Sequence, residues 1–171
     1  MNKNNRLLKY SDVVLVPKLS NTESRGTIDV SCKFGNQLFN LPVIPANMRT
    51  VINEGLAKML SDANLFYVMH RFDMSNYRFV KRANEEHWKT ISISVGVKPS
   101  DIEALERIAY DDLRVDYITI DIAHGHSSLM KNTIAEIKEN FGDKTFIIAG
   151  NVATSDAVKE ITDWGADAIK V

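Results

Sequence analysis

From Asn40 onward, short apolar runs rich in β-branched residues alternate with stretches of helical spacing. The apolar runs are continuous rather than strictly alternating, which is typical of parallel strands buried on both faces. Five strand–helix pairs followed by a sixth strand therefore predict an α/β fold with a parallel sheet. The six predicted strands are Leu41–Pro45, Phe66–Met69, Thr90–Val95, Tyr117–Ile120, Thr145–Ala149 and Ala168–Val171.

The stretches between these runs carry the start and stop signals of helices. The run Ser100–Glu103 has the pattern of a capping box, and Ser155 with Asp156 suits the start of the last helix. Gly142 is predicted to end the preceding helix, because glycine readily adopts the left-handed conformation found there. These signals support helices between the predicted strands.

The first 40 residues differ from the rest of the chain. Asp12–Pro17 is strand-like, and Phe34–Phe39 is predicted to form a short hairpin with Gly35 and Asn36 near its turn. No low-complexity linker divides the chain. We therefore interpret residues 1–171 as a single domain, with residues 1–40 as a segment that precedes the repeating units.

Two architectures fit this pattern: a doubly wound open sheet, and the first part of a (β/α)8 barrel. An open sheet that binds nucleotides usually has a glycine-rich loop after its first strand. Here the first predicted strand continues through Pro45–Thr50 without any glycine. Periodicity alone leaves both architectures open. Both place their chemistry at the carboxyl ends of the strands.

Polar residues follow several of the predicted strands at these carboxyl ends. Asp121 after the fourth strand is suited to hold a ribose hydroxyl or an amide N–H, or to cap its own loop. Arg49 and Arg71 are candidate anion-binding residues, although lone arginines are usually solvated. His124 and His126 have a zinc-compatible spacing but lack a convincing third ligand, so a structural role is favoured.

Composition excludes several classes of protein. Lys and Arg total 21 against 22 for Asp and Glu, and the net charge of −1 argues against a nucleic-acid binder. The single cysteine, Cys32, excludes a disulfide framework and a multi-cysteine metal site. No run approaches the roughly 18 apolar residues of a membrane span. We therefore expect a cytoplasmic protein with no membrane association.

Seven motifs, in order along the chain, resemble one family of (β/α)8 barrels. That family is the IMP dehydrogenase/GMP reductase family, and the resemblance covers nearly the whole chain. It predicts a TIM barrel of which this chain supplies the N-terminal segment and about strands 1 to 6. The motifs are Asp12–Pro17 with Glu23–Arg25, Leu41–Met48, Met69–Phe72, Ser94–Val97, Asp121–Ser127, Ala149–Thr154 and Gly165–Val171.

Within the family, the reductase pattern is the better match. The connection from Arg71 to Thr90 is short, where dehydrogenases usually carry inserted regulatory modules, and the motifs DIAHGHS and AGNV are close to the reductase form. The resemblance then implies purine nucleotide interconversion, in which NADPH reductively deaminates GMP to IMP and ammonia. The alternatives are NAD-dependent oxidation of IMP to XMP, and a non-catalytic half-barrel that acts as an interaction module.

The resemblance also implies roles for individual residues. Ser24 and Arg25 would contact the adenosine end of the cofactor from a neighbouring subunit, and Arg71 would lie near the same cofactor. The nicotinamide riboside would be flanked by Asp121, Ile122 and Ala123, with Asn151 nearby. Asn47 and Met48 would line the purine pocket. A homotetramer is the expected assembly, and a potassium ion would be bound in the complete protein.

Two departures from the family pattern stand out. Arg49 occupies a position where the family often has aspartate. The family's catalytic cysteine lies in a loop after strand six, beyond Val171, and Cys32 precedes the first barrel strand and cannot replace it. We therefore assign no catalytic residue within the chain. We expect the sequence to be part of a longer protein, because an unclosed barrel would be inactive and prone to associate.

Overall fold

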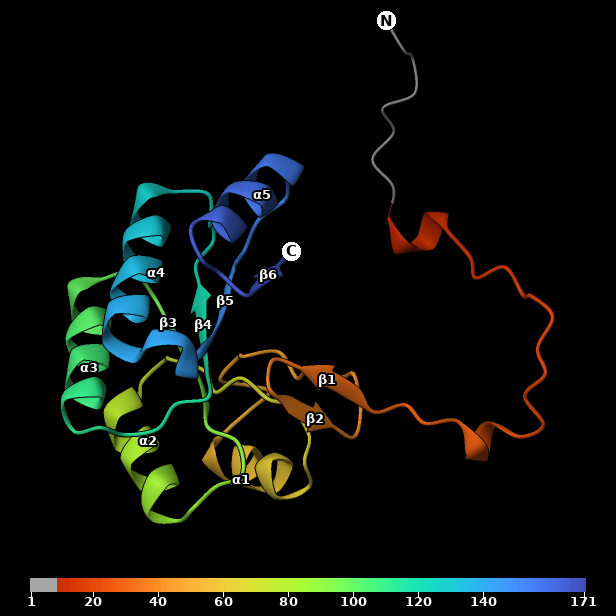
Figure 1. Cartoon of the computed structure of the whole chain (residues 1–171), viewed down its shortest axis with the longest axis horizontal. Helices are drawn as coiled ribbons and strands as arrows, with labels where there is room; N and C mark the ends of the chain where they lie inside the picture. Colours follow the sequence, from red (N-terminus) through yellow and green to blue (C-terminus); the bar gives the residue numbers. More distant parts are fainter. Residues whose placement is uncertain (1–8) are drawn as a thin grey trace, which may run out of the picture.

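The computed structural model describes residues 9–171 (Figure 1). Its α-helices are α1 (Glu54–Asp62), α2 (Asn76–Glu85), α3 (Pro99–Tyr110), α4 (Ser128–Phe141) and α5 (Ser155–Asp163). Its strands are β1 (Cys32–Phe34), β2 (Gln37–Phe39), β3 (Ser92–Val95), β4 (Tyr117–Asp121), β5 (Phe146–Gly150) and β6 (Ala168–Lys170). Three short 3-10 turns complete the list: η1 (Tyr10–Asp12), η2 (Arg25–Thr27) and η3 (Gly142–Lys144).

The parallel sheet predicted from the apolar runs is confirmed. Its strand order is β3-β4-β5-β6, and every neighbouring pair is parallel. The register pairs Val95 with Ile120, and Ile120 with Ala149. Sequential order with helical crossovers is the arrangement of a (β/α) barrel rather than of a sheet whose order reverses.

Helices α2, α3 and α4 lie on one side of this sheet, and the β1–β2 hairpin lies on the other (Figure 1). On the helix side, the outward side chains of the strands, such as Ile93 and Ile118, pack against Ile108 and Ile134 of the helices. All four of these side chains have no exposed surface. This side supplies the main apolar core, because burial of each such side chain contributes roughly 1.5–3 kcal/mol.

The opposite face of the sheet carries an aromatic cluster, defined as Phe34, Phe39, Phe66, Tyr117 and Phe146. The Phe66 and Tyr117 rings meet edge to face, with centroids 4.8 Å apart. The Tyr117 hydroxyl donates to the carbonyl of Phe34 at 2.6 Å. The predicted hairpin is therefore confirmed, and the aromatic cluster attaches it to the amino ends of β4 and β5.

The first two predicted barrel strands are not regular strands. Leu41–Pro45 forms no strand ladder, because Pro42 and Pro45 have no N–H to donate. Phe66–Met69 makes only a single bridge, between Met69 and Ile93. The prediction of a strand at Asp12–Pro17 is wrong: η1 ends at Asp12, and residues 11–30 are exposed in an arm that runs away from the sheet (Figure 1).

Helix ends follow the predicted capping chemistry with small shifts. Asp101 accepts from the Lys98 N–H at 3.1 Å, so α3 begins at Pro99, one residue before the predicted box. Thr154 rather than Ser155 caps α5. Gly142 has φ 61° and ends α4 as predicted. Among the described residues, no helix has the length and apolar character needed to cross a membrane.

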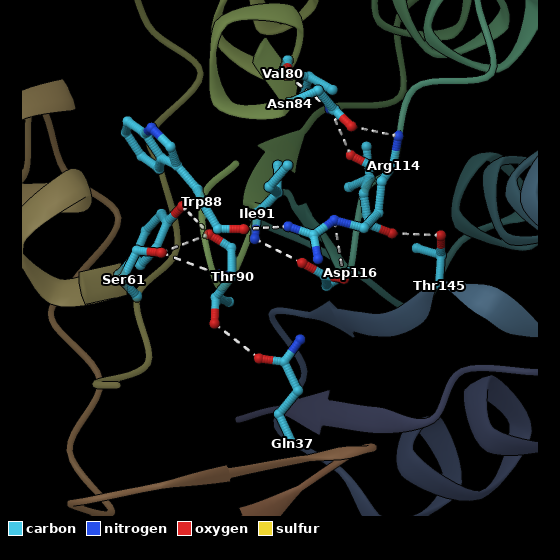
Figure 2. A network of polar contacts seen from close by, with 12 residues as sticks. Gln37, Ser61, Val80, Asn84, Trp88, Thr90, Ile91, Arg114, Asp116 and Thr145 are labelled. Atoms are coloured by element: carbon cyan, nitrogen blue, oxygen red, sulfur yellow. Dashed lines mark hydrogen bonds and ion pairs between the residues drawn. The ribbon is translucent and has the colours of Figure 1, made fainter. Parts of the chain in front are cut away.

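The amino ends of the strands are joined by a network of buried polar contacts (Figure 2). Asp116 accepts from the Ile91 N–H at 2.7 Å, and its pKa is raised by burial, against the lowering effects of this bond and of the Arg114 charge. Asp116 joins the β3 and β4 ends, and Asp167 repeats the contact between β5 and β6 by accepting from the Ile147 N–H at 2.7 Å. These carboxylates satisfy strand N–H groups that would otherwise be orphaned, and so fix the strand ends.

The inner face of the sheet is only partly covered in the described chain. A cavity of about 350 Å³ lies against Phe34, Phe66 and Ile148, and Asn47 and Lys170 also line it. Val43 and Ile44, which border this side, are 63% and 52% exposed. The apolar inner face of the sheet is therefore partly open within residues 9–171.

Two glycines with nearly equal positive φ angles allow a test of the hairpin attachment. Gly35 has φ 59° and Gly142 has φ 61°, but a Cβ at Gly35 would lie 2.8 Å from Phe146 Cδ2, whereas one at Gly142 would meet nothing within 4 Å. Gly142→Ala is expected to cost about 1 kcal/mol through backbone strain alone. Gly35→Ala is expected to cost about 1–3 kcal/mol more, because the aromatic cluster must move. Urea unfolding measures both, and equal losses would contradict the role given to this contact.

Candidate functional site

The polar side chains at the carboxyl ends of the strands converge on Asp121. Asn47 Nδ2 donates to Asp121 Oδ2 at 2.9 Å, and Lys170 Nζ donates to Asp121 Oδ1 at 2.6 Å. Lys170 Nζ also donates to Asn47 Oδ1 at 3.2 Å, which closes a ring of three side chains. Residues 123 positions apart in the sequence thus meet at one edge of the sheet. The ring comes from the loop after the first extended segment and from the ends of β4 and β6.

Charge balance keeps Asp121 ionised at this edge. Burial acts to raise its pKa, but the hydrogen bonds from Lys170 and Asn47 and the charges of Lys170 and Arg71 outweigh burial and hold the pKa below the usual value. The Asp121 side chain is 18% exposed, so the carboxylate remains accessible. A fixed carboxylate with free lone pairs is suited to accept hydrogen bonds from ligand hydroxyl or amide groups.

Gly150 and Asn151 extend the site along β5. Asn151 Nδ2 lies 3.4 Å from Asp121 Oδ1 and 3.3 Å from the Ile122 carbonyl. The main chains of Asn151 and Ile122 also bond, with the Asn151 N–H donating at 2.8 Å. Asn151 thus lies beside Asp121, and its expected place near the nicotinamide riboside stays a prediction.

Arg71 lies across the ends of β3 and β4. Its guanidinium stacks over the Phe72 ring with Cζ 4.8 Å from the centroid, and Nη2 contacts the Asp121 carbonyl at 3.4 Å. A Cβ at Gly96 would lie 3.3 Å from Arg71 Nη1, so the glycine leaves room for the arginine. Arg71 Nε is buried with no hydrogen-bond partner in the described chain. This orphaned donor fits a site for an anionic or carbonyl-bearing ligand.

The remaining predicted residues divide into two groups. Ala123 is exposed and Ile122 half-buried beside Asp121, and Met48 is 54% exposed next to Asn47. Ser24 and Arg25 lie instead in the extended arm, where Ser24 caps η2 by accepting from the Gly26 N–H at 3.2 Å. The described chain does not bring these two arm residues to Asp121.

His126, the second of the two histidines, makes side-chain contacts with α5 and the residue that follows it. His126 Nε2 lies 3.1 Å from Glu160 Oε2, and its ring lies against Trp164 at 5.9 Å between centroids. No cluster of three or more His, Cys, Asp or Glu side chains in residues 9–171 is arranged to hold a metal ion. The structural interpretation of His126 is therefore the one that its contacts support.

Lys170 is the residue of the site that sequence reasoning missed. It ends β6, just as Asp121 ends β4, so the rule that directed attention to polar residues at strand ends also applied to it. The motif containing it was recognised, but no role was given to the lysine. Cys32, in contrast, lies in the hairpin at the amino ends of the strands, away from this site.

Comparison with known proteins agrees with the barrel fold. The chain matches the IMP dehydrogenase / GMP reductase domain over residues 7–171. The chain belongs to this family. It is 50% identical over 163 residues to a GMP reductase of Mesoplasma florum, covering 95% of this chain and 50% of that protein. A GMP reductase of Mycoplasma mycoides is 44% identical over 166 residues, covering 97% of this chain and 52% of the relative.

A solved structure gives the same result for the fold. Inosine 5′ monophosphate dehydrogenase from Legionella pneumophila superposes with a TM-score of 0.81 at 28% identity, covering 96% of this chain and 50% of that one. The chain thus spans about half the length of the relatives it matches. The order β3-β4-β5-β6 is the corresponding portion of a family barrel.

The lowered pKa of Asp121 predicts a specific dependence of stability on pH. Asp121→Asn is expected to lower the free energy of unfolding by about 1 kcal/mol at pH 7, since the partly exposed Lys170 loses its ionised partner. A carboxyl with a lowered folded pKa stabilises fully above its unfolded pKa, so the difference from wild type should shrink as pH falls below about 4. Urea unfolding at several pH values measures this difference. Asp143→Asn is the control, because Asp143 is fully exposed, and a difference independent of pH would contradict the assignment.

Proposed function

We propose that the protein containing this chain interconverts purine nucleotides by NADPH-dependent reductive deamination of GMP. The balanced reaction is GMP + NADPH + H⁺ → IMP + NH₃ + NADP⁺. The observation that carries the proposal is the ring of Asn47, Asp121 and Lys170 at the strand ends of a family barrel. Two relatives of the chain, at 44% and 50% identity, are named GMP reductase. Residues 71–90 contain only α2 between two core segments, which supports the reductase over a dehydrogenase with inserted modules.

The cofactor side of the site is the part that this chain would supply. When bound, NADPH supplies a hydride. Asp121 would accept hydrogen bonds from the nicotinamide ribose, with Ile122 and Ala123 alongside and Asn151 within reach. Arg71 would place its unpartnered Nε toward the cofactor. The fit rests on an ionised, accessible carboxylate and an orphaned buried donor in neighbouring loops.

The purine side and the nucleophile complete the proposal. Asn47 and Met48 would line the purine pocket above the cavity beside Phe66. The resemblance places the nucleophilic cysteine and the carbonyl ligands of a potassium ion beyond Val171, so this chain alone is expected to lack GMP-dependent NADPH oxidation. We also propose a cytoplasmic homotetramer in which Ser24 and Arg25 of one subunit reach the cofactor of the next. The exposed arm that carries them supports this exchange.

The substrate assignment predicts the outcome of one assay on the protein as purified from its own gene. Loss of NADPH absorbance at 340 nm is expected with GMP and not with AMP. One ammonia should be released for each NADPH consumed, because C2 exchanges its amino group for hydride. Oxidation of IMP with NAD, with no GMP-dependent NADPH loss, would overturn the reductase in favour of the dehydrogenase. Absence of both reactions would favour an interaction module.

The two candidate arginines can be separated by matched substitutions. Arg71→Met is expected to lower kcat/KM for NADPH about ten-fold, since about 1.4 kcal/mol is lost with a buried charged contact. Arg49→Met is expected to change it less than about two-fold, because Arg49 is exposed and paired with exposed Asp73. Steady-state kinetics at fixed GMP measures both. Equal effects of the two substitutions would contradict the placement of the cofactor beside Arg71.

A further inference from the structure

The ring of three side chains is organised around the Lys170 ammonium. One of its N–H groups points at Asp121 Oδ1 at 2.6 Å and another at Asn47 Oδ1 at 3.2 Å. The Asn47 amide then has one usable orientation, with its oxygen toward the lysine and its NH₂ toward Asp121 Oδ2 at 2.9 Å. A flipped amide would set its NH₂ against the ammonium. Lys170 therefore controls the direction of both of the other side chains.

The ring leaves part of the Asp121 carboxylate available. An ionised carboxylate has about four acceptor sites. Lys170 occupies one acceptor site on Oδ1, and Asn47 occupies one on Oδ2. The further contact from Asn151 to Oδ1, at 3.4 Å, is long. At 18% exposure, the carboxylate faces solvent with its remaining lone pairs while both of its oxygens are held. This is a preorganised acceptor rather than a sequestered ion pair.

The backbone under Lys170 is fixed by a glycine. Gly150 pairs with Lys170 in the register of β5 and β6. A Cβ at Gly150 would lie 2.6 Å from both the Cβ and the carbonyl oxygen of Lys170, so no other residue fits without moving β6. The Val152 N–H donates to the same carbonyl at 3.1 Å. The lysine is thus held at its Cα by the sheet and at its ammonium by the ring.

A contribution to stability does not by itself explain why the position of Lys170 is fixed so closely. Lys170 is 39% exposed, and an ion pair with a solvated partner typically contributes little to stability. Lys138 provides a comparison at the amino ends of the strands: it is 30% exposed, and its Nζ lies 3.8 Å from Asp143 Oδ1 and from Asp167 Oδ2. That lysine lies in a loose pair with no shared amide, whereas Lys170 makes short, directed bonds at the candidate site.

We propose that Lys170 is a positioning residue, which fixes the Asp121 carboxylate and the Asn47 amide so that Asp121 presents a preset acceptor to the hydroxyl groups of a bound nucleotide cofactor. This inference deepens the proposed function and rests on it for the identity of the ligand. The geometric part, that Lys170 sets the state of Asp121, stands on the ring itself. Lys170 does not need to touch a ligand to act in this way.

The kinetic test uses the purified protein with Lys170→Met, Lys170→Arg and Lys138→Met. Lys170→Met is expected to raise KM for NADPH about ten-fold, and to move the acid limb of the kcat/KM profile up by about one pH unit, because Asp121 loses its nearest positive charge. Lys170→Arg should return most of the KM for NADPH and most of the pH profile to wild-type values, since the positive charge is kept. Lys138→Met should change neither. Identical pH profiles for Lys170→Met and Lys138→Met would overturn the proposal.

A second readout separates this inference from the proposed function. The ¹³C chemical shift of the Asp121 carboxyl, followed by NMR against pH, reports its titration without any ligand. The midpoint is expected about one unit higher in Lys170→Met and unchanged in Lys138→Met. That result supports the positioning role even if the protein does not oxidise NADPH, and an unshifted midpoint overturns it. If Lys170→Met fails to fold, Lys170→Gln gives the same test with a polar side chain.

Discussion

All strands of a parallel sheet point the same way, and this constraint arranges the whole structure. It gathers the amino ends of β3 to β6 at one edge and their carboxyl ends at the other. The helices that return the chain bury one face of the sheet, so the strands carry apolar side chains on that face along their length. The charged side chains that contact the sheet, such as Asp116 and Asp121, lie at its two edges, and the two edges have different tasks.

The amino-end edge holds the strands together. Asp116 and Asp167 each accept from an N–H of a neighbouring strand at 2.7 Å, and the hydroxyl of Thr145 donates to the Val115 carbonyl at the same distance. These contacts satisfy backbone hydrogen-bonding groups and leave these side chains little capacity to bind a ligand. Burial raises the pKa of Asp116 there, and the Ile91 N–H and the Arg114 charge offset only part of this rise.

The carboxyl-end edge shows the opposite balance. Asp121 is also partly buried, but Lys170 and Asn47 donate to it and its pKa is lowered. The same side chain, aspartate next to a parallel strand, is thus tuned in opposite directions by its donors. A carboxylate that is ionised, oriented and accessible is the form that binds hydroxyl groups, and this difference marks the edge at which chemistry is expected.

Much of the fold could be predicted, because burial leaves a local pattern in the sequence. The continuous apolar runs at Tyr117–Ile120 and Thr145–Ala149 gave strands within one residue of those observed. The same rule failed at Asp12–Pro17, where an apolar run has no neighbouring strand within the described chain to bond with. It also failed at Leu41–Pro45, where two prolines prevent a ladder. Hydrophobicity predicts that a segment is to be covered, but not what covers it.

The sequence by itself determined the class of fold, the family and the polar character of the strand ends, because each of these depends on residue type and spacing along the chain. Only the tertiary structure decided that Lys170 belongs with Asp121 and Asn47. Those contacts join segments 49 and 123 residues apart, and they depend on the close approach of β5 and β6 at Gly150. Strand register fixes such distances, and it is set by the packing of the whole sheet rather than by any local pattern.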